Sequence, residues 1–267
     1  MDRADSTHWF GLWSLVFSMF VIFFFFLPRL LFKKRSEPRS TIVIGFCGLK
    51  GAGKDMSARV LDRYGFKKAS FAGLLKDIVA VAFGFNREML EGTTEKARVV
   101  RKKIDGQWAA TLSMPGFTPV KALQLWGTDL VRNHFHAAFW ALSLFKNIDE
   151  NQFGPRVAVT DVRYPNEAVM VVQRGGVIVR LERGVPPEWY TQIKQAAAGR
   201  GTGPEWYERV VTNKEPAATV KLDFPDMPHE SEWRSIGCED FIVLNNGSPN
   251  DLRQKLIEEL LDRGYKL

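Results

Sequence analysis

Short apolar runs alternate along this chain with longer stretches in which apolar residues recur every three or four positions. The short runs are typical of buried strands, and the longer stretches are typical of amphipathic helices. Strands are predicted at 41–47, 66–71, 156–160, 177–181 and 241–244, and helices at 54–64, 73–83, 120–144, 166–174 and 249–263. This alternation predicts an α/β fold, a parallel sheet flanked by helices, with ligands at the carboxyl ends of the strands.

One apolar run near the N-terminus is too long for a strand. Residues 9–27 hold no charge, residues 30–32 extend the run, and the basic cluster 33–35 closes it. A run of this length spans a bilayer, and its basic flank places the remainder in the cytoplasm. We therefore expect a tail at 1–8, a transmembrane segment at 9–32 and a basic flank with linker at 33–40. The alternative is a start codon assigned too far upstream, which gives a soluble cytoplasmic protein.

The first predicted strand leads into a glycine-rich loop, GLKGAGKD at 48–55, and then into a predicted helix. This is the order of a phosphate-binding P-loop, whose backbone N–H groups and helix N-terminus surround a phosphate. Lys54 can reach the β- and γ-phosphates of a nucleoside triphosphate. Asp55 stands where a Ser or Thr hydroxyl normally contacts Mg²⁺, and a carboxylate is itself a good Mg²⁺ ligand. We therefore expect Asp55 at the metal.

A second candidate site follows the predicted strand at 156–160. Asp161 can hold Mg²⁺ through water or accept a substrate hydroxyl, and Arg163 can neutralise charge on a transferring phosphoryl group. The alternative is a local turn, in which Asp161 pairs with Arg163, and Pro165 or Asn166 starts the next helix.

The positive charge of the chain lies partly in its N-terminal segment. Residues 1–35 carry five of the 37 basic residues and two of the 30 acidic residues, so 32 basic and 28 acidic residues remain. This modest excess suits a small anionic substrate, and we expect no direct binding of nucleic acid. The two cysteines form neither a metal-ligand spacing nor a disulfide framework, which is consistent with a reducing cytoplasm.

Several segments stand in a distinctive order along the chain. They are GKD at 53–55, FAGLLK at 71–76, ALQLWGTDLVR at 122–132 with Trp140 beyond it, DVR at 161–163 with Glu167, and HESE at 229–232. This order resembles that of bacteriophage-type deoxynucleoside monophosphate kinases over nearly all of residues 41–267. The resemblance implies a P-loop kinase domain at 41–267 that uses ATP and Mg²⁺ to convert deoxynucleoside monophosphates to diphosphates, supplying dNTP precursors for phage DNA synthesis.

The resemblance also implies roles for individual residues. The implied catalytic residues are Lys54, Asp161 and Arg163. The implied ATP-binding residues are Gly51, Gly53, Lys54, Asp55, Met56 and Ser57, and Asp55 also binds the metal. The residues implied to bind the monophosphate are Lys50, Lys76, Arg98, Arg132, Trp140, Asp161, Arg163 and Glu167, with Trp140 stacking on the base or forming a wall beside it.

Structural roles without any contact to a ligand stay open as alternatives at several of these positions. Lys76 fits a solvated helix face, and Trp140 fits an apolar core. Arg98 belongs to a charge run with Arg101, 102 and 103 that is typical of a solvated helix face. Structural roles are expected for the histidines at 134 and 136. The segment 184–236, which holds Pro187 before a helix-like sequence, is either a lid or an ordinary surface insertion.

Two other functions remain open from the sequence. Animal phosphomevalonate kinases share a similar GKD loop and a strand-end Asp-x-Arg, so the chain is alternatively a kinase for another phosphorylated metabolite. The second alternative is a catalytically silent, membrane-tethered nucleotide-binding module. The expected partners are ATP, a deoxynucleoside monophosphate and the membrane, and we allow for a homodimer.

Overall fold

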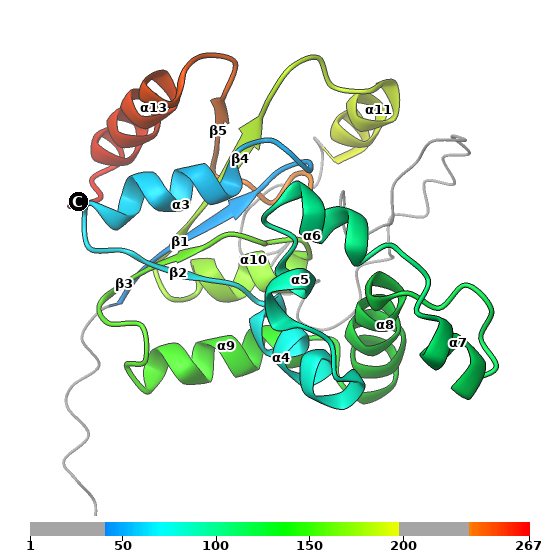
Figure 1. Ribbon diagram of the computed structural model, residues 1–267. Coiled ribbons are helices and arrows are strands. Elements are labelled where there is room, and N and C mark those ends of the chain that lie inside the picture. The colour runs from blue at the N-terminus through cyan, green and yellow to red at the C-terminus, as the bar shows by residue number, and fades with distance from the viewer. Residues whose placement is uncertain (1–40, 198–234) are drawn as a thin grey trace, which may run out of the picture. The chain divides into compact units, whose positions relative to one another are not determined.

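Five parallel strands form one sheet in the order β2-β3-β1-β4-β5 in the computed structural model, which describes residues 41–197 and 235–267 (Figure 1). The strands are β1 Ile42–Cys47, β2 Lys67–Ala69, β3 Arg156–Val159, β4 Val177–Glu182 and β5 Phe241–Leu244. The central strand β1 pairs with both β3 and β4, so that Ile44 lies opposite Ala158 on one side and Val177 on the other. All five predicted strands are confirmed.

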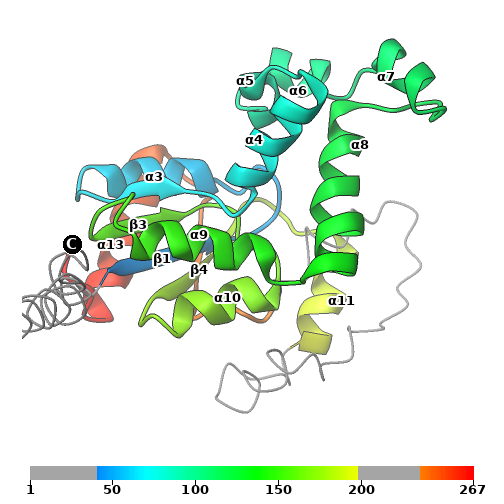
Figure 2. The same ribbon diagram turned by 90° about the horizontal axis from the view of Figure 1, so that it is seen from below.

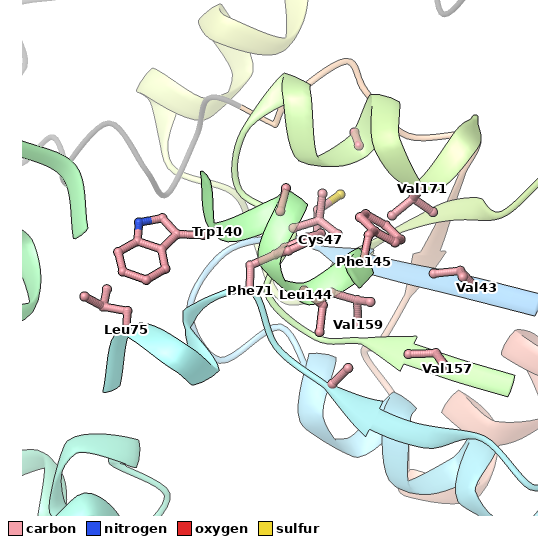
Figure 3. Close-up of a cluster of buried hydrophobic side chains, with 14 of the residues drawn as sticks. Val43, Cys47, Phe71, Leu75, Trp140, Leu144, Phe145, Val157, Val159 and Val171 are labelled. Atoms are coloured by element: carbon pink, nitrogen blue, oxygen red, sulfur yellow. The ribbon is translucent and has the colours of Figure 1, made fainter. Parts of the chain in front are cut away.

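Helices cover both faces of this sheet. Helices α3 Lys54–Asp62 and α13 Pro249–Asp262 pack on one face, and α4 Ala72–Phe83, α9 Phe139–Asp149 and α10 Pro165–Val172 pack on the other (Figure 2). Successive residues of β1 point to opposite faces. Val43 and Cys47 therefore lie in the core with α9 and α10, which Figure 3 shows, while Ile44 and Phe46 lie in the core beneath α3 and α13. The predicted α/β fold is confirmed.

Four short helices lie beyond the carboxyl ends of the strands (Figure 1, Figure 2). They are α5 Arg87–Glu91, α6 Glu95–Val100, α7 Gly106–Thr111 and α8 Pro119–Gln124. Each begins after a polar residue whose side chain accepts a hydrogen bond from a backbone N–H in the first turn, and Thr94 does this at the start of α6. These helices hold five or six residues each, which is too short for a clear apolar period, and α5 to α7 were not predicted.

The prediction of a single helix at 120–144 is wrong. The chain instead forms α8, a π-helix η2 at Leu125–Phe135, and then α9. His136 is extended, with φ −160° and ψ 123°, and its N–H bonds to the carbonyl of Val131. Its ring Nδ1 accepts a 3.1 Å hydrogen bond from the N–H of Ala138, immediately before α9. These local bonds separate the two helices, and the expected structural role of His136 fits them.

Helix α11, Glu188–Ala197, follows Pro187, as the sequence predicts. Its residues Trp189, Tyr190 and Ile193 pack with Ile236, which belongs to the second described range, 235–267. The rest of the predicted lid or insertion at 184–236 is outside the described residues, as are the HESE motif and the predicted transmembrane segment. Within 41–197 and 235–267, no helix combines the length and apolar character that crossing a bilayer requires.

Candidate active site

The site lies where two adjacent strands send their chains to opposite faces of the sheet. The chain leaves β1 for α3 on one face, and it leaves the neighbouring strand β3 for α10 on the other (Figure 2). Such a switch point opens a crevice at the carboxyl ends of the strands, where ligands bind in sheets of this kind. The P-loop and the Asp161–Arg163 segment therefore follow adjacent parallel strands at the same edge of the sheet, as the sequence predicts.

Glycine is required at two turns of the P-loop. Gly48 has φ +133°, and a Cβ there would lie 2.4 Å from the carbonyl oxygen of Leu181. Gly53 has φ +108°, and its Cβ would lie 2.4 Å from the side-chain nitrogen of Asn245. Lys54 folds over the loop and donates hydrogen bonds of 2.7 Å and 3.0 Å to the carbonyls of Gly48 and Leu49. A triphosphate in the loop would compete with these carbonyls for the ammonium group.

Asn245 is a part of this site that sequence reasoning missed. Its side chain donates a 2.9 Å hydrogen bond to the carbonyl of Ala52 in the P-loop, and its backbone N–H donates to Glu182 at 2.8 Å. The signal that was available is its position immediately after the last predicted strand, at the edge of the sheet where the other functional segments end.

The other predicted ATP-binding residues differ in exposure. Asp55 is exposed and forms a 2.6 Å ion pair with Lys68 of β2, and Met56 is also exposed. Ser57 is fully buried, and its hydroxyl has no hydrogen-bond partner among the described residues. It lies among the buried residues of α3, and its contact with ATP stays a prediction. Gly51 has φ +85° and open space around it.

Asp55 fits a Mg²⁺ site of the kind that nucleotide kinases use. The described residues hold no cluster of three or more Asp, Glu, His or Cys side chains that would enclose a cation by themselves. Mg²⁺ is normally held by one or two carboxylates together with phosphate oxygens and water. Asp55, in the first turn of α3 and beside Lys54, provides one such carboxylate.

Asp161 binds the segment between β2 and α4. Its carboxylate accepts hydrogen bonds from the Ser70 hydroxyl at 2.7 Å and from the backbone N–H groups of Phe71 and Ala72 at 2.8 Å and 3.0 Å. The local turn that was the alternative is correct in one respect, since Pro165 does begin α10. The other part of that alternative, a local pairing of Asp161 with Arg163, is not among these hydrogen bonds. Asp161 thus fixes the start of α4 against the end of β3.

Arg132 and Glu167 form a buried ion pair that joins η2 to the first turn of α10. Glu167 is 1% exposed, and it also accepts bonds from the backbone N–H groups of Arg163 and Tyr164 at 2.8 Å and 3.1 Å. The Arg132 guanidinium lies 3.9 Å from the centre of the Tyr164 ring. Burial raises the pKa of Glu167, and the Arg132 charge opposes that rise. The pair fixes the turn that carries Arg163.

Lys76 also lies in an ion-pair network. Its ammonium is 2.9 Å from Glu91, which pairs in turn with Arg87, and Arg87 pairs with Asp77 at 2.5 Å. The Lys76 side chain is 15% exposed, so the alternative that Lys76 lies on a solvated helix face is wrong. Direct contact of Lys76 with substrate stays a prediction.

Basic side chains are carried by α6 and by the segment that follows β3. Arg98 is 40% exposed and pairs with Glu95 at 3.0 Å, as on a solvated helix face. Arg101, which follows α6, is half-buried, and the charges of Arg163 and Arg98 both act on it. Sequence reasoning named Arg98 as the phosphate contact in this charge run and left Arg101 without a role.

Two cavities lie beside these groups. The first, of about 310 Å³, lies between α4, α5 and α9, and Trp140 lines it. Trp140 is 2% exposed and its indole N–H donates a 2.9 Å hydrogen bond to the carbonyl of Gly127, so the residue belongs to the core. The second, of about 240 Å³, lies between the P-loop and the end of β4, and Lys50 and Arg183 line it. The predicted substrate contact Lys50 thus lies on the β4 side of the loop.

Comparison with known proteins supports the relationship suggested by the sequence. The chain is 34% identical over 155 residues to a protein of Acanthamoeba polyphaga mimivirus named "Putative deoxynucleotide monophosphate kinase", and the match covers 53% of this chain and 74% of that protein. No protein-family model matches the chain.

Solved structures with a similar course of the chain include two kinases. Dephospho-CoA kinase from Campylobacter jejuni has a TM-score of 0.36 and 16% identity, covering 84% of this chain and 97% of its own. Shikimate kinase from Acinetobacter baumannii has a TM-score of 0.37 and 13% identity, covering 85% and 97%. Similarity at this level does not bear on activity.

Proposed function

Because the chain belongs to the deoxynucleotide monophosphate kinase family, we propose that it transfers the γ-phosphoryl group of ATP to a deoxynucleoside 5′-monophosphate, giving a deoxynucleoside diphosphate and ADP. The observation that carries this proposal is the placement of the P-loop and Arg163 on adjacent strands of one crevice. Phosphoryl transfer needs donor and acceptor in line with their charges neutralised, and two basic sites across a crevice provide that.

The P-loop side of the crevice suits the donor. Backbone N–H groups of the loop and the N-terminus of α3 face the phosphates, and Lys54 exchanges its bonds to Gly48 and Leu49 for the β- and γ-phosphates. Asp55 would hold Mg²⁺, which would supply positive charge that offsets the negative charge of the phosphates. The 240 Å³ cavity beside the loop offers space for the donor nucleoside, with Arg183 at its edge.

The opposite side of the crevice suits the acceptor. Arg163 projects from the turn that Glu167 and Arg132 hold, so its backbone is fixed by the buried ion pair. A guanidinium there stabilises charge on the transferring group more strongly than it stabilises the separate reactants. Asp161 contributes by fixing the start of α4 beside this turn. Its contact with a substrate hydroxyl or with metal-bound water is a further part of the proposal.

A substrate panel tests the function. ADP release from the purified chain would be followed with ATP, Mg²⁺ and, in turn, dAMP, dGMP, dCMP, dTMP, the ribonucleoside monophosphates and phosphomevalonate. We expect turnover with one or more deoxynucleoside monophosphates and none in Lys54→Ala. Turnover with phosphomevalonate alone would assign the kinase to another metabolite, and binding of ATP without turnover on any substrate would identify a silent module.

The biological setting is also a proposal. The diphosphates would enter dNTP synthesis, and their use in phage DNA synthesis rests on the sequence resemblance. We further propose that residues 9–32 anchor the protein in a membrane with the kinase domain in the cytoplasm, because the run is apolar and its basic flank follows it. Carbonate extraction and protease protection of the full-length protein test this. Release of the full-length protein into the soluble fraction would contradict the anchor, and mass spectrometry of the natural N-terminus tests the alternative start.

A further inference from the structure

The cavity between the P-loop and the end of β4 has two cations in its lining. Lys50 of the loop and Arg183, the first residue after β4, both line this cavity of about 240 Å³. Both residues are exposed, and neither side chain forms an ion pair or a hydrogen bond within the described ranges. Among the described residues, the lining has one acidic member, Glu182, whose Oε1 accepts hydrogen bonds from Tyr190 at 2.8 Å and from Lys194 at 2.9 Å. The lining therefore keeps an excess of positive charge.

The backbone that carries Arg183 is fixed against the P-loop. The carbonyl oxygen of Leu181 lies 2.4 Å from the point where a Cβ on Gly48 would stand, so the end of β4 touches the first turn of the loop. On the other side of Arg183, the N–H of Gly184 donates a 2.7 Å hydrogen bond to the side chain of Asn246. The Arg183 side chain therefore extends from a fixed point beside the loop.

The cavity also has an apolar part. Apolar side chains supply most of the remaining lining, from Leu49, Ala52, Leu181, Val185, Pro186 and Tyr190. Pockets that are apolar apart from a few placed polar groups are typical of small-molecule sites, in which the polar groups fix the orientation of the ligand. An apolar surface beside two cations and a phosphate-binding loop fits a ligand that has an uncharged part and an anionic part. A nucleoside polyphosphate has both.

We propose that Arg183 binds the phosphate chain of the ATP donor, with its guanidinium directed from the cavity toward the phosphates in the P-loop. A guanidinium presents parallel N–H groups that match two phosphate oxygens, and it stays charged at neutral pH. Lys54 belongs to the first turn of α3, whereas Arg183 follows β4. The two cations therefore reach the phosphates from different segments of the fold, and sequence reasoning assigned Arg183 no role.

This inference rests on the proposed function for taking ATP as the phosphoryl donor. Two other roles for Arg183 differ from it in measurable ways. A structural residue would contribute to the free energy of unfolding. A residue that contacts the nucleoside would support binding of adenosine as much as binding of ATP. A residue that binds the phosphates supports affinity for ADP and ATP and leaves affinity for adenosine unchanged.

The test is calorimetric titration of the full-length protein with ATP, ADP and adenosine in the presence of Mg²⁺, together with initial rates against ATP and against the monophosphate. Arg183→Ala removes the cation, and Arg183→Lys keeps a positive charge without the planar fork. Arg63→Ala is the matched control. Arg63 is exposed, forms no side-chain ion pair within the described ranges, and follows the last turn of α3, about 14 Å along the helix axis from Lys54. Urea unfolding of each variant measures its stability.

We expect Arg183→Ala to weaken binding of ATP and ADP by about 10- to 100-fold, in keeping with loss of a charge-assisted hydrogen bond. Adenosine binding, the free energy of unfolding and the KM for the monophosphate should stay near their wild-type values. Arg183→Lys should lose less affinity than Arg183→Ala, and Arg63→Ala should match the wild type.

Two results would overturn the inference. They are wild-type affinity for ATP and ADP in Arg183→Ala, and a loss of adenosine affinity equal to the loss of ATP affinity. Wild-type protein that binds ATP and phosphorylates none of the monophosphates would instead refute the proposed function, and the ATP and ADP titrations would still decide the role of Arg183.

Discussion

The side-chain amide of Asn245 donates a 2.9 Å hydrogen bond to the backbone carbonyl of Ala52, which joins the end of the last strand to the middle of the P-loop. The same side chain occupies the space that a Cβ on Gly53 would need. The conformation of the loop therefore depends on a residue that is not part of its motif.

Replacing Asn245 with Ala leaves the carbonyl of the buried residue Ala52 without its partner, which costs about 1–3 kcal/mol. We expect the KM for ATP to rise by about tenfold and the KM for the monophosphate to stay near its wild-type value. Initial rates measured against each substrate check this. Gln254→Ala is the control, because Gln254 is exposed and its side-chain amide donates a 2.8 Å hydrogen bond to Glu258 of the same helix. Equal KM values for ATP in the two variants would contradict the role of Asn245.

Lys54→Ala and Arg163→Ala should each lower kcat by at least about 10²-fold, because each removes charge stabilisation concentrated in the transition state. Steady-state kinetics measure the loss, and circular dichroism shows whether the fold is intact. Lys146→Ala is the matched control, since Lys146 is 74% exposed and pairs loosely with Glu150 at 3.8 Å. A folded variant with near-normal turnover would remove that residue from catalysis.

The ion pair between Asp55 and Lys68 makes two opposite predictions about Mg²⁺. Asp55→Ala should raise the Mg²⁺ concentration needed for half-maximal activity and change ATP affinity less, because the backbone and Lys54 still hold the phosphates. Lys68→Ala removes the cation that competes with Mg²⁺ at 2.6 Å. It should lower that concentration by about two- to fivefold, which is the scale of an exposed ion pair. Superimposable Mg²⁺ titrations for Asp55→Ala and wild type would place the metal elsewhere.

Breaking the buried pair of Arg132 and Glu167 from one side should be costly. Glu167→Ala leaves a charged guanidinium that is 11% exposed without its carboxylate, and we expect a loss of about 3–5 kcal/mol in the free energy of unfolding. The double variant Arg132→Met, Glu167→Leu should recover part of this loss, because no charge is then buried. Urea unfolding measures both. A double variant that loses the sum of the two single effects would show that the residues act independently.

The lowered pKa of Glu91 leads us to expect that the stability of the protein depends on pH. Burial alone would raise its pKa, but hydrogen bonds and charges from Arg87 and Lys76 lower the pKa from 4.5 to about 2. Because the folded pKa lies below the unfolded one, ionised Glu91 stabilises the fold above pH 4.5. This contribution is lost as pH falls from about 4.5 to about 2. After a discount for partial exposure, Glu91→Gln should cost about 1–2 kcal/mol at pH 7.

Urea unfolding of Glu91→Gln and wild type at pH 7, 4.5 and 3 checks this prediction. The difference between the two proteins should be constant from pH 7 to about 5 and then shrink. A difference that persists unchanged at pH 3 would mean that the glutamine disturbs packing and that the ionic contribution of Glu91 is small.

The strands and the P-loop could be predicted from the sequence because local sequence determines them. Strands buried on both faces are continuous apolar runs, and the P-loop is a pattern of glycines between a strand and a helix. The break after Phe135 was missed because apolar residues continue at helical spacing across it, through Phe139 and Leu142. What interrupts the helix is a set of hydrogen bonds at His136, which periodicity does not reveal.

The partners of the site residues could not be predicted, because pairing depends on the folded chain. Asp161 and Ser70 are 91 positions apart, and Lys76 reaches Glu91 only because α5 folds back on α4. The sequence therefore indicated which residues carry charge in the crevice, and only the structure shows which of those charges are already neutralised.

The order of the strands has a consequence for how the protein is made. The P-loop lies in the first described strand–helix unit of the domain. Asn245, whose side chain bonds to Ala52 in that loop, follows the last described strand and is 193 positions later in the chain. A chain emerging from the ribosome completes the P-loop segment early and lacks Asn245 until β5 has been made, since the N-terminal part is exposed first. Nascent chains that stop before β5 should therefore fail to retain ATP, and nucleotide binding should arise abruptly when the final strand pairs with β4.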